Sequence, residues 1–339
     1  MKTTLLSLVL LSSFLATHAS ASEAEKRQLL HTLKQQITQL YVMQNSIPKI
    51  IDGLSQFENS QAFTQAKDVS ALLPILNETL TEFDKHLSVS KITSQPRKKG
   101  GVAKPNESWF AQLERKNFGF NHVEILPGNV GVLAFWGFSN VTEQSKQKVQ
   151  ALMTLLDGVD SLIIDLRENG GGDAAMVQLI SSYFLDKRTH LNSFYSRDTG
   201  KTSEYWTVPI AGKKRATLPI YVLTSNATFS AAEEFTYNFK HLHRATVIGE
   251  KTKGGANPWR FVNLTNNVRV SMPVSMAINP ITETNWEGVG VKPHHTIPAS
   301  QALSYAHQMA LQELAKTKTN IHDLNDIKSA LSDVNTILK

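Results

Sequence analysis

The stretch TFSAAEEF, Thr228–Phe235, stands at the junction of two elements that the sequence predicts. An apolar run from Leu218 to Leu223 precedes it and is typical of a buried strand, whereas a helical pattern starts at Ser230 and continues to about Leu242. A serine at such a junction lies where the first free N–H groups of a helix point at a ligand. This position suits a nucleophile whose transition state is an oxyanion. A lone serine there is, however, more often a plain N-cap residue.

Strands and helices alternate around this stretch. Apolar runs predict strands at Val123–Leu126, Val130–Phe135, Ser161–Leu166 and Thr246–Ile248, and a hairpin formed by Arg260–Leu264 and Val268–Met272. Helical periodicity covers Val141–Leu156 and Ala174–Leu185. The alternation predicts an α/β layer fold in which helices cover a sheet.

The two ends of the chain differ from this α/β core. Lys2, the apolar Leu5–Leu15 and the A-x-A sequence Ala19–Ala21 predict a signal peptide over residues 1–21, cleaved after Ala21. We therefore expect a periplasmic or secreted protein without stable membrane insertion. Apolar stripes predict a small helical bundle over residues 22–92. A linker over 93–108, an α/β core over 109–299 and a helical tail over 300–339 complete the expected domains.

The composition argues against several kinds of site: thiol, nucleic-acid and metal sites. The chain has no cysteine, so neither a disulfide nor a thiol takes part. The formal net charge is +6, but the one dense basic patch, Arg97–Lys99, has no interleaved aromatic residues, and we expect no nucleic-acid partner. The histidine pairs His241/His243 and His294/His295 lack further ligands at metal-binding spacing. We therefore expect no metal site.

A second landmark is DLRENGGG, Asp165–Gly172, which follows an apolar strand and precedes a helix. Its three consecutive glycines permit positive φ and close backbone approach. The exposed N–H groups of such a turn can bind an anion or an oxyanion. Neither nucleotide-binding glycine pattern is met, so a nucleotide is not favoured. A plain tight turn, shaped by an ion pair between Asp165 and Arg167, is the other interpretation.

Four ordered segments resemble the S41 serine peptidases, the tail-specific or C-terminal processing protease superfamily. They are Leu162–Gly171, Thr224–Phe235, Val247–Ala256 and Trp286–Pro293. The resemblance implies a crotonase-like ββα core and a serine-type peptidase that cleaves peptides or unfolded proteins through an acyl-enzyme, without a cofactor. It makes Ser230 the candidate nucleophile. The implied oxyanion donors are the N–H groups of Ala231 and of Gly171 or Gly172.

The catalytic base is less evident. The tail-specific proteases place a lysine in a turn after a Gly-Glu strand, and here Gly255 stands at that position. The other branch resembles the tricorn core protease and the interphotoreceptor retinoid-binding protein domains, and its peptidases use a His–Ser–Glu arrangement. Phe83–Val89 resembles the end of the helical part of that branch, which makes His86 the candidate base. Glu287 in the closing motif is then the candidate acid, and no PDZ-sized insert is present.

Two alternatives stay open. The first is a catalytically inactive protein of this fold that binds a retinoid-like or lipid-like ligand. The second is a Ser–Lys peptidase that uses Lys253. Glu233 and Glu234 are expected to interact with the helix dipole in the first turn after the serine. The pattern does not define cleavage specificity or oligomeric state.

Overall fold

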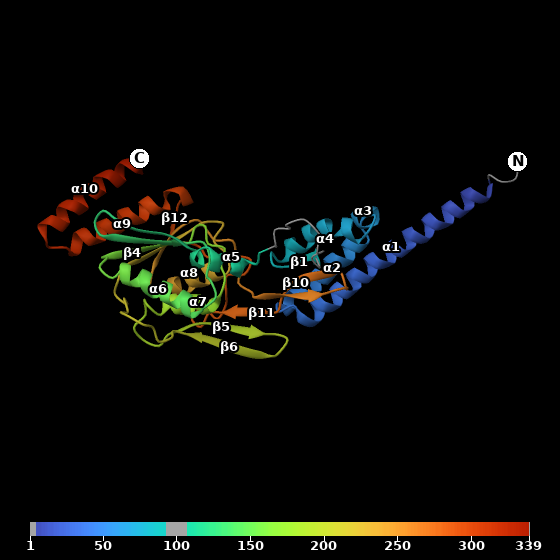
Figure 1. The fold of residues 1–339 in the computed structure, drawn as a ribbon, viewed down its shortest axis with the longest axis horizontal. Helices are drawn as coiled ribbons and strands as arrows, with labels where there is room; N and C mark the ends of the chain where they lie inside the picture. The colour runs from blue at the N-terminus through green and yellow to red at the C-terminus, as the bar shows by residue number, and fades with distance from the viewer. Residues whose placement is uncertain (1–4, 93–106, 339) are drawn as a thin grey trace, which may run out of the picture. The chain divides into compact units, whose positions relative to one another are not determined.

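The computed structural model describes residues 5–92 and 107–338, with the backbone alone for residues 5–21 and 337. The chain forms two compact units. The first unit contains residues 1–102, 195–201 and 257–276, and the second contains residues 103–194, 202–256 and 277–339. Figure 1 labels their elements. Except for Glu107 and Ser108, the predicted linker lies outside the described residues.

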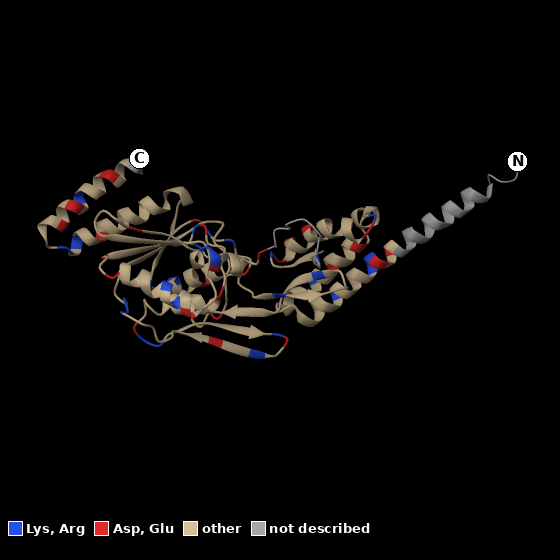
Figure 2. Ribbon diagram, in the orientation of Figure 1, with Lys and Arg blue, Asp and Glu red and all other residues tan. Residues whose placement is uncertain are grey.

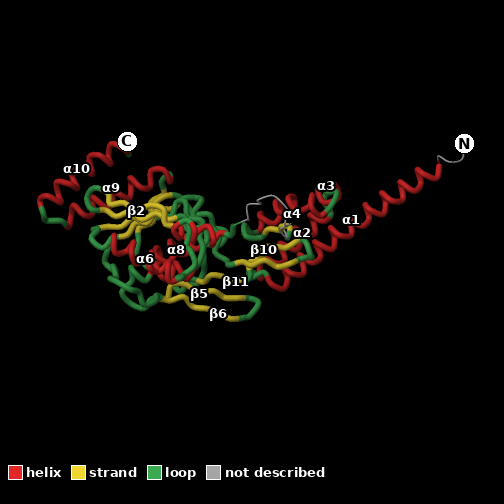
Figure 3. The backbone as a smooth tube through the Cα atoms, viewed as in Figure 1, coloured by secondary structure: helices red, strands yellow, loops and turns green. Residues whose placement is uncertain are grey.

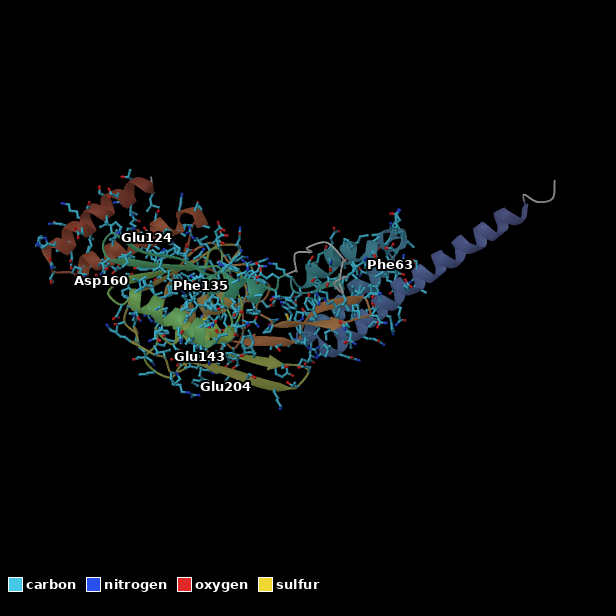
Figure 4. All side chains as sticks on the ribbon, viewed as in Figure 1. Phe63, Glu124, Phe135, Glu143, Asp160 and Glu204 are labelled. Carbon is cyan, nitrogen blue, oxygen red and sulfur yellow. The ribbon has the colours of Figure 1, made fainter. Side chains whose placement is uncertain are left out.

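In its described residues, the first unit contains four helices and a three-stranded sheet. The helices are α1 (Leu5–Leu40), α2 (Ile47–Glu58), α3 (Gln61–Gln65) and α4 (Val69–Phe83), with a 3-10 turn at Gln44–Ser46. The strands are β1 (Ser88–Lys91), β9 (Trp259–Asn263) and β10 (Val268–Pro273), antiparallel in the order β1-β10-β9. The predicted hairpin is therefore confirmed, and the core that Leu33 and Leu76 form includes Val270. Phe63 is fully buried among these helices (Figure 4).

The second unit is built on a six-stranded mixed sheet. Its strands are β2 (Phe120–Leu126), β3 (Val130–Phe135), β4 (Ser161–Asp165), β7 (Ile220–Thr224), β8 (Thr246–Gly249) and β12 (His295–Thr296). Their order is β12-β8-β7-β4-β3-β2, and every pair is parallel except β2 with β3. The predicted alternation of strands and helices thus yields a mixed α/β fold.

Helices cover both faces of this sheet (Figure 3). They are α5 (Trp109–Arg115), α6 (Glu143–Leu155), α7 (Ala174–Ser181), α8 (Ala231–His241), α9 (Ala302–Thr317) and α10 (Ile321–Ile337), with 3-10 turns at Asn117–Gly119 and Ala299–Gln301. Because successive strand residues point to opposite faces, Leu162 and Ile164 pack towards α6 and α8, whereas Ile163 packs towards α9. Phe135 lies in the core on the α6 face (Figure 4).

A smaller sheet has the order β11-β5-β6, formed by β5 (His190–Ser196), β6 (Lys201–Trp206) and β11 (Ser275–Ile278). The chain passes from one unit to the other within these strands. Acidic and basic residues are interspersed on both units (Figure 2). In the described part of the chain, no helix has the length and apolar character needed to cross a membrane.

Candidate active site

Ser230 is the last residue of the connection between β7 and α8, and its backbone is strained. Its φ is 55° and its ψ is −121°, a combination that residues with a side chain rarely adopt. Such a conformation costs about 1–3 kcal/mol and persists only where the surrounding structure holds it. A serine on a sharp strand-to-helix turn has the geometry of a nucleophile elbow, which presents the hydroxyl at the edge of the sheet.

The Glu233 carboxyl holds this turn in place. Its Oε2 accepts the backbone N–H groups of Ser230 and Gly255, both at 2.9 Å. Its Oε1 accepts the N–H of Gly254 at 2.7 Å and the hydroxyl of Thr252. Burial raises the pKa of this fully buried carboxyl, and the four hydrogen bonds oppose that shift. Glu233 therefore joins the serine turn to the turn that follows β8.

The contact of Glu233 with Ser230 has a signal in the sequence, but the other contacts have none. An acidic residue three positions after an N-cap serine is a capping-box pattern, which predicts the bond to the serine N–H. The position of Glu233 in the first turn of the helix predicts only an interaction with the helix dipole. The bonds to Gly254 and Gly255 are donated by backbone N–H groups, and side-chain types in the sequence do not predict such bonds.

The glycine turn packs directly against the serine. Gly171 has φ 91°, and a Cβ placed on it would lie 2.6 Å from the Cβ of Ser230, so only glycine fits there. The N–H of Phe229 donates to the carbonyl of Asn169 at 3.0 Å. The N–H of Gly171 donates to Asn169 Oδ1 at 2.9 Å, and this bond occupies one of the predicted oxyanion donors.

Two backbone donors remain beside Ser230. Within the described residues, the N–H groups of Gly172 and Ala231 donate no hydrogen bond. Gly172 forms a bridge with Phe138, and a Cβ on Gly172 would lie 1.9 Å from the Phe138 carbonyl oxygen. Of the predicted oxyanion donors, the N–H groups of Gly172 and Ala231 are therefore the two that donate no hydrogen bond to a described residue, whereas the N–H of Gly171 is engaged.

An ion pair shapes the start of the glycine turn, as predicted. Arg167 Nη2 lies 2.6 Å from Asp165 Oδ2, and this contact raises the pKa of Arg167. Arg167 Nη1 donates to the carbonyl of Ala299 at 2.7 Å, which anchors the end of β4 to the segment before α9.

The closing motif, Trp286–Pro293, is hydrogen-bonded to the turn after β8 that Glu233 also holds. Glu287 Oε2 accepts the N–H of Ala256 at 2.7 Å, and the indole of the buried Trp286 donates to the carbonyl of Gly255 at 3.0 Å. Because Gly255 in turn donates to Glu233, the structure links Glu287 to Ser230 through consecutive hydrogen-bonded segments.

Lys253, the base of the alternative dyad, also lies beside the serine turn. Its backbone N–H donates to the carbonyl of Thr228 at 3.1 Å, and its Nζ lies 4.8 Å from the centroid of the Phe229 ring. The amine therefore lies within cation–π distance of that ring.

His86 belongs to the first unit, so its pairing with Ser230 stays a prediction. The structure gives it a partner that the sequence pattern did not indicate. His86 Nδ1 lies 3.4 Å from Asp84 Oδ1, and the His86 backbone N–H donates to the same oxygen at 2.7 Å. Burial acts to raise the pKa of Asp84, but hydrogen bonds from His86 and from Tyr41 keep it below its ordinary value. Asp84 therefore stays ionised beside the imidazole at neutral pH.

The comparisons with known proteins find the family that the four sequence segments resemble. Residues 129–297, about half of the chain, match the model of peptidase family S41, and the match includes Ser230 and Glu287 but not His86. A probable CtpA-like serine protease from Staphylococcus aureus is 26% identical over 242 residues, which cover 68% of this chain and 46% of the relative. The chloroplastic carboxyl-terminal-processing peptidase 2 from Arabidopsis thaliana is 26% identical over 203 residues, 57% of this chain and 39% of the relative.

The chain thus aligns with less than half the length of these two curated relatives. Among solved structures, a putative peptidase from Parabacteroides merdae superposes with a TM-score of 0.58 at 18% identity. The superposition covers 80% of this chain and 90% of that one, and it shows a shared fold.

Proposed function

The chain belongs to peptidase family S41, and from this premise we propose that it is a serine peptidase that hydrolyses peptide bonds through an acyl-enzyme on Ser230. The observation that carries the proposal is the strained backbone of Ser230, held by Glu233 next to two unoccupied backbone donors. Residues with a strained backbone of this kind are concentrated at functional sites, where the surrounding structure maintains the strain.

In the proposed reaction, Ser230 Oγ attacks the carbonyl carbon of the scissile bond while His86 takes its proton. The N–H groups of Gly172 and Ala231 bind the oxyanion, and the His86 imidazolium then protonates the leaving amine. Water attacks the resulting ester while His86 takes a proton from it, the bond to Ser230 Oγ breaks, and His86 returns the proton to Oγ as the product acid leaves.

The neighbourhood of His86 supports its role as base. The Asp84 carboxylate beside Nδ1 favours a proton on that nitrogen, which leaves Nε2 as the acceptor, and it stabilises the imidazolium. Glu287 is proposed as the acidic group that supports the active-site charge.

Location and fold type form part of the same proposal. The N-terminal signal pattern supports export to the periplasm or the outside of the cell, where peptides and unfolded proteins would be the substrates. The order of β2, β3, β4 and β7, with a helix after each parallel strand, supports a crotonase-like core.

Cleavage of an unfolded protein tests the proposal. The wild-type chain and a Ser230→Ala variant are incubated with the same denatured protein, and the fragments are identified by mass spectrometry. We expect fragments from the wild type and none above background from the variant. Equal cleavage by both proteins would exclude Ser230 as the nucleophile. If the wild type cleaves neither this protein nor a peptide library, the chain is not a peptidase.

A further inference from the structure

A surface cavity lies at the amino ends of three neighbouring parallel strands of the six-stranded sheet. Its volume is about 480 Å³, within the range of small-molecule sites, roughly 300–1,000 Å³. Ile220 begins β7, Thr246 begins β8 and His295 begins β12, and all three residues line the cavity. Ser230 precedes α8, whereas the cavity residue His243 follows it. This helix of 11 residues, about 16 Å long, therefore separates the cavity from the proposed nucleophile.

Arg244, which lines the cavity, carries a guanidinium without an acidic partner. The residue is half-buried, and its Nε and Nη2 donate to the carbonyls of Phe184 at 2.8 Å and of Arg215 at 2.7 Å. Among the described residues, Arg244 forms no ion pair, and its Nη1 donates no hydrogen bond. Nη1 is not among the buried polar atoms that lack a partner, so it is open to solvent. The two carbonyls therefore hold the guanidinium in place and leave one nitrogen for a ligand.

Three histidines line the same cavity. They are His243, His294 and His295, and the described part of the lining contains no acidic residue. The Nδ1 of His294 accepts the backbone N–H of Val247 at 2.9 Å, so the neutral ring carries its proton on Nε2 and can donate it to a ligand. The Tyr305 hydroxyl lies 3.3 Å from the Nδ1 of His295. The lining therefore offers nitrogen donors without a competing carboxylate.

Positive charges gather around these donors. Lys240, at the end of α8, donates from Nζ to the carbonyl of Lys292 at 2.6 Å and so joins α8 to the segment before β12. Partial burial lowers the pKa of His241 and of His294, and the positive charges of Lys240 and of neighbouring histidines lower both further. Burial lowers the pKa of Arg244 to about 10, so its guanidinium stays charged at neutral pH. An anion beside these groups would relieve their mutual repulsion.

A negative charge acts on one other residue of the lining. Burial raises the pKa of Tyr221 to about 12, and the charge of Glu313 on α9 adds to that shift. Glu313 is itself paired with Lys316, whose Nζ lies 2.6 Å from its Oε1. No carboxylate of a described residue acts on His294 or on Arg244. The cationic part of the lining is therefore available to an anion from outside the chain.

A phosphate group matches these donors better than a carboxylate does. It presents three acceptor oxygens and carries nearly two negative charges at neutral pH, whereas a carboxylate presents two oxygens and one charge. A guanidinium binds two phosphate oxygens side by side, which leaves the third oxygen for an imidazole N–H. The cavity has room for more than this one group, so the expected ligand is a molecule that carries the phosphate as an ester.

We propose that Arg244, His243 and His294 form a site for the phosphate group of a phosphate ester, either a small soluble molecule or a lipid headgroup. The guanidinium and the Nε2–H of His294 donate to the phosphate oxygens, and His243 adds a positive charge when it is protonated. The bound dianion raises the pKa of His294, so binding takes up protons from the solvent. The site does not depend on the proposed peptidase activity, and its tests measure binding alone.

Titration of the intact chain tests the site. Isothermal titration calorimetry measures the affinity for glycerol 3-phosphate, sulfate and glycerol in a buffer without phosphate or sulfate. We expect glycerol 3-phosphate to bind with a dissociation constant below about 1 mM, sulfate to bind more weakly and glycerol not to bind. Flotation with phosphatidylcholine vesicles, with and without phosphatidate, tests the lipid headgroup.

The two measurements distinguish the sources of the phosphate. Binding of glycerol 3-phosphate assigns a soluble ligand, and binding to phosphatidate vesicles alone assigns a headgroup. If both bind, glycerol 3-phosphate should release the chain from the vesicles, because both ligands would use one site. A chain that binds neither ligand overturns the site.

Two variants test whether the ligand binds in the cavity. Arg244→Gln should weaken binding of the phosphate ester at least about tenfold, because the charged guanidinium is lost. Arg244 also anchors two backbone carbonyls, so His243→Asn provides a second variant at an exposed residue. His243 has φ 52°, a conformation that asparagine tolerates. We therefore expect an unchanged fold and at least about threefold weaker binding in His243→Asn.

Lys146→Gln is the matched control. It removes one positive charge from α6 in the same unit, where the Lys146 side chain is 50% exposed and pairs with Glu143 (labelled in Figure 4). It should bind the phosphate ester as the wild type does. Wild-type affinity in both cavity variants overturns the site, as does equal weakening in His243→Asn and Lys146→Gln.

The pH dependence of sulfate binding tests the histidines. Sulfate keeps both of its charges between about pH 6 and pH 8, so a change in affinity comes from the protein. Because the bound anion raises the pKa of His294, sulfate should bind at least about threefold more tightly at pH 6 than at pH 8, and the change should be smaller in His243→Asn. Equal affinity at the two pH values would exclude the histidines from the site.

Discussion

The backbone N–H of Ser230 donates a 2.9 Å hydrogen bond to Glu233 Oε2. The same oxygen accepts the N–H of Gly255 at the same distance. One carboxyl group therefore fixes the strained backbone of the proposed nucleophile and the turn to which the closing motif is bound.

Glu233→Gln should impair both stability and catalysis. Each carboxyl oxygen accepts two hydrogen bonds, and an amide nitrogen in place of one oxygen would face two donors. We expect a loss of about 2–3 kcal/mol in the free energy of unfolding, measured with urea. We also expect kcat to fall roughly 100-fold, because a small shift of the serine misplaces its hydroxyl. Glu313→Gln, at an exposed ion pair on α9, is the matched control. Wild-type values for Glu233→Gln would show that the carboxyl does not hold the turn.

Gly171→Ala should displace Ser230 directly. The new methyl group would lie 2.6 Å from the serine Cβ, on a residue with φ 91°. We expect activity to be lost and the melting temperature to fall. Gly158→Ala makes the same chemical change where nothing lies within 4 Å, and it should behave as wild type. Similar activity in the two variants would contradict the close packing of the glycine turn on the serine.

The pH dependence of stability should report Glu234. Its pKa rises from 4.5 to about 8 on folding, so the folded state holds a proton that the unfolded state has lost. This contribution is fully present below pH 4.5 and is lost as the pH rises through 8. Wild-type protein should therefore lose on the order of a few kcal/mol of unfolding free energy between about pH 5 and pH 9. Glu234→Gln should show a flatter profile, and parallel profiles for the two proteins would show that Glu234 titrates normally.

His86→Ala and Lys253→Ala should have opposite effects. Removal of the proposed base should lower kcat at least about 1000-fold, whereas removal of the lysine should leave most of the activity. Asp84→Asn tests the partner of His86 and should also lower kcat strongly, because the amide no longer stabilises the imidazolium. Loss of activity in Lys253→Ala with an active His86→Ala would assign the base to the lysine instead.

Local patterns in the sequence predicted the elements of the α/β core, because buried strands such as β4 and β7 are continuous apolar runs. They also predicted the Asp165–Arg167 pair, whose members lie two residues apart. They missed the pairing of the β9–β10 hairpin with β1, because this pairing joins Ser88 to Ser271, which lies 183 positions further along the chain. The hydrogen bonds of Glu233 with Gly254 and Gly255 join residues 21 and 22 positions apart, and the sequence did not predict them either.

Covalent labelling tests the role of Ser230 most directly. The intact chain is treated with a fluorophosphonate, which reacts with activated serines, and the adduct is located by peptide mass mapping. We expect one adduct, on Ser230, absent from Ser230→Ala and strongly reduced in Glu233→Gln. No adduct on the folded wild-type chain, or an adduct on another serine, would contradict Ser230 as the nucleophile.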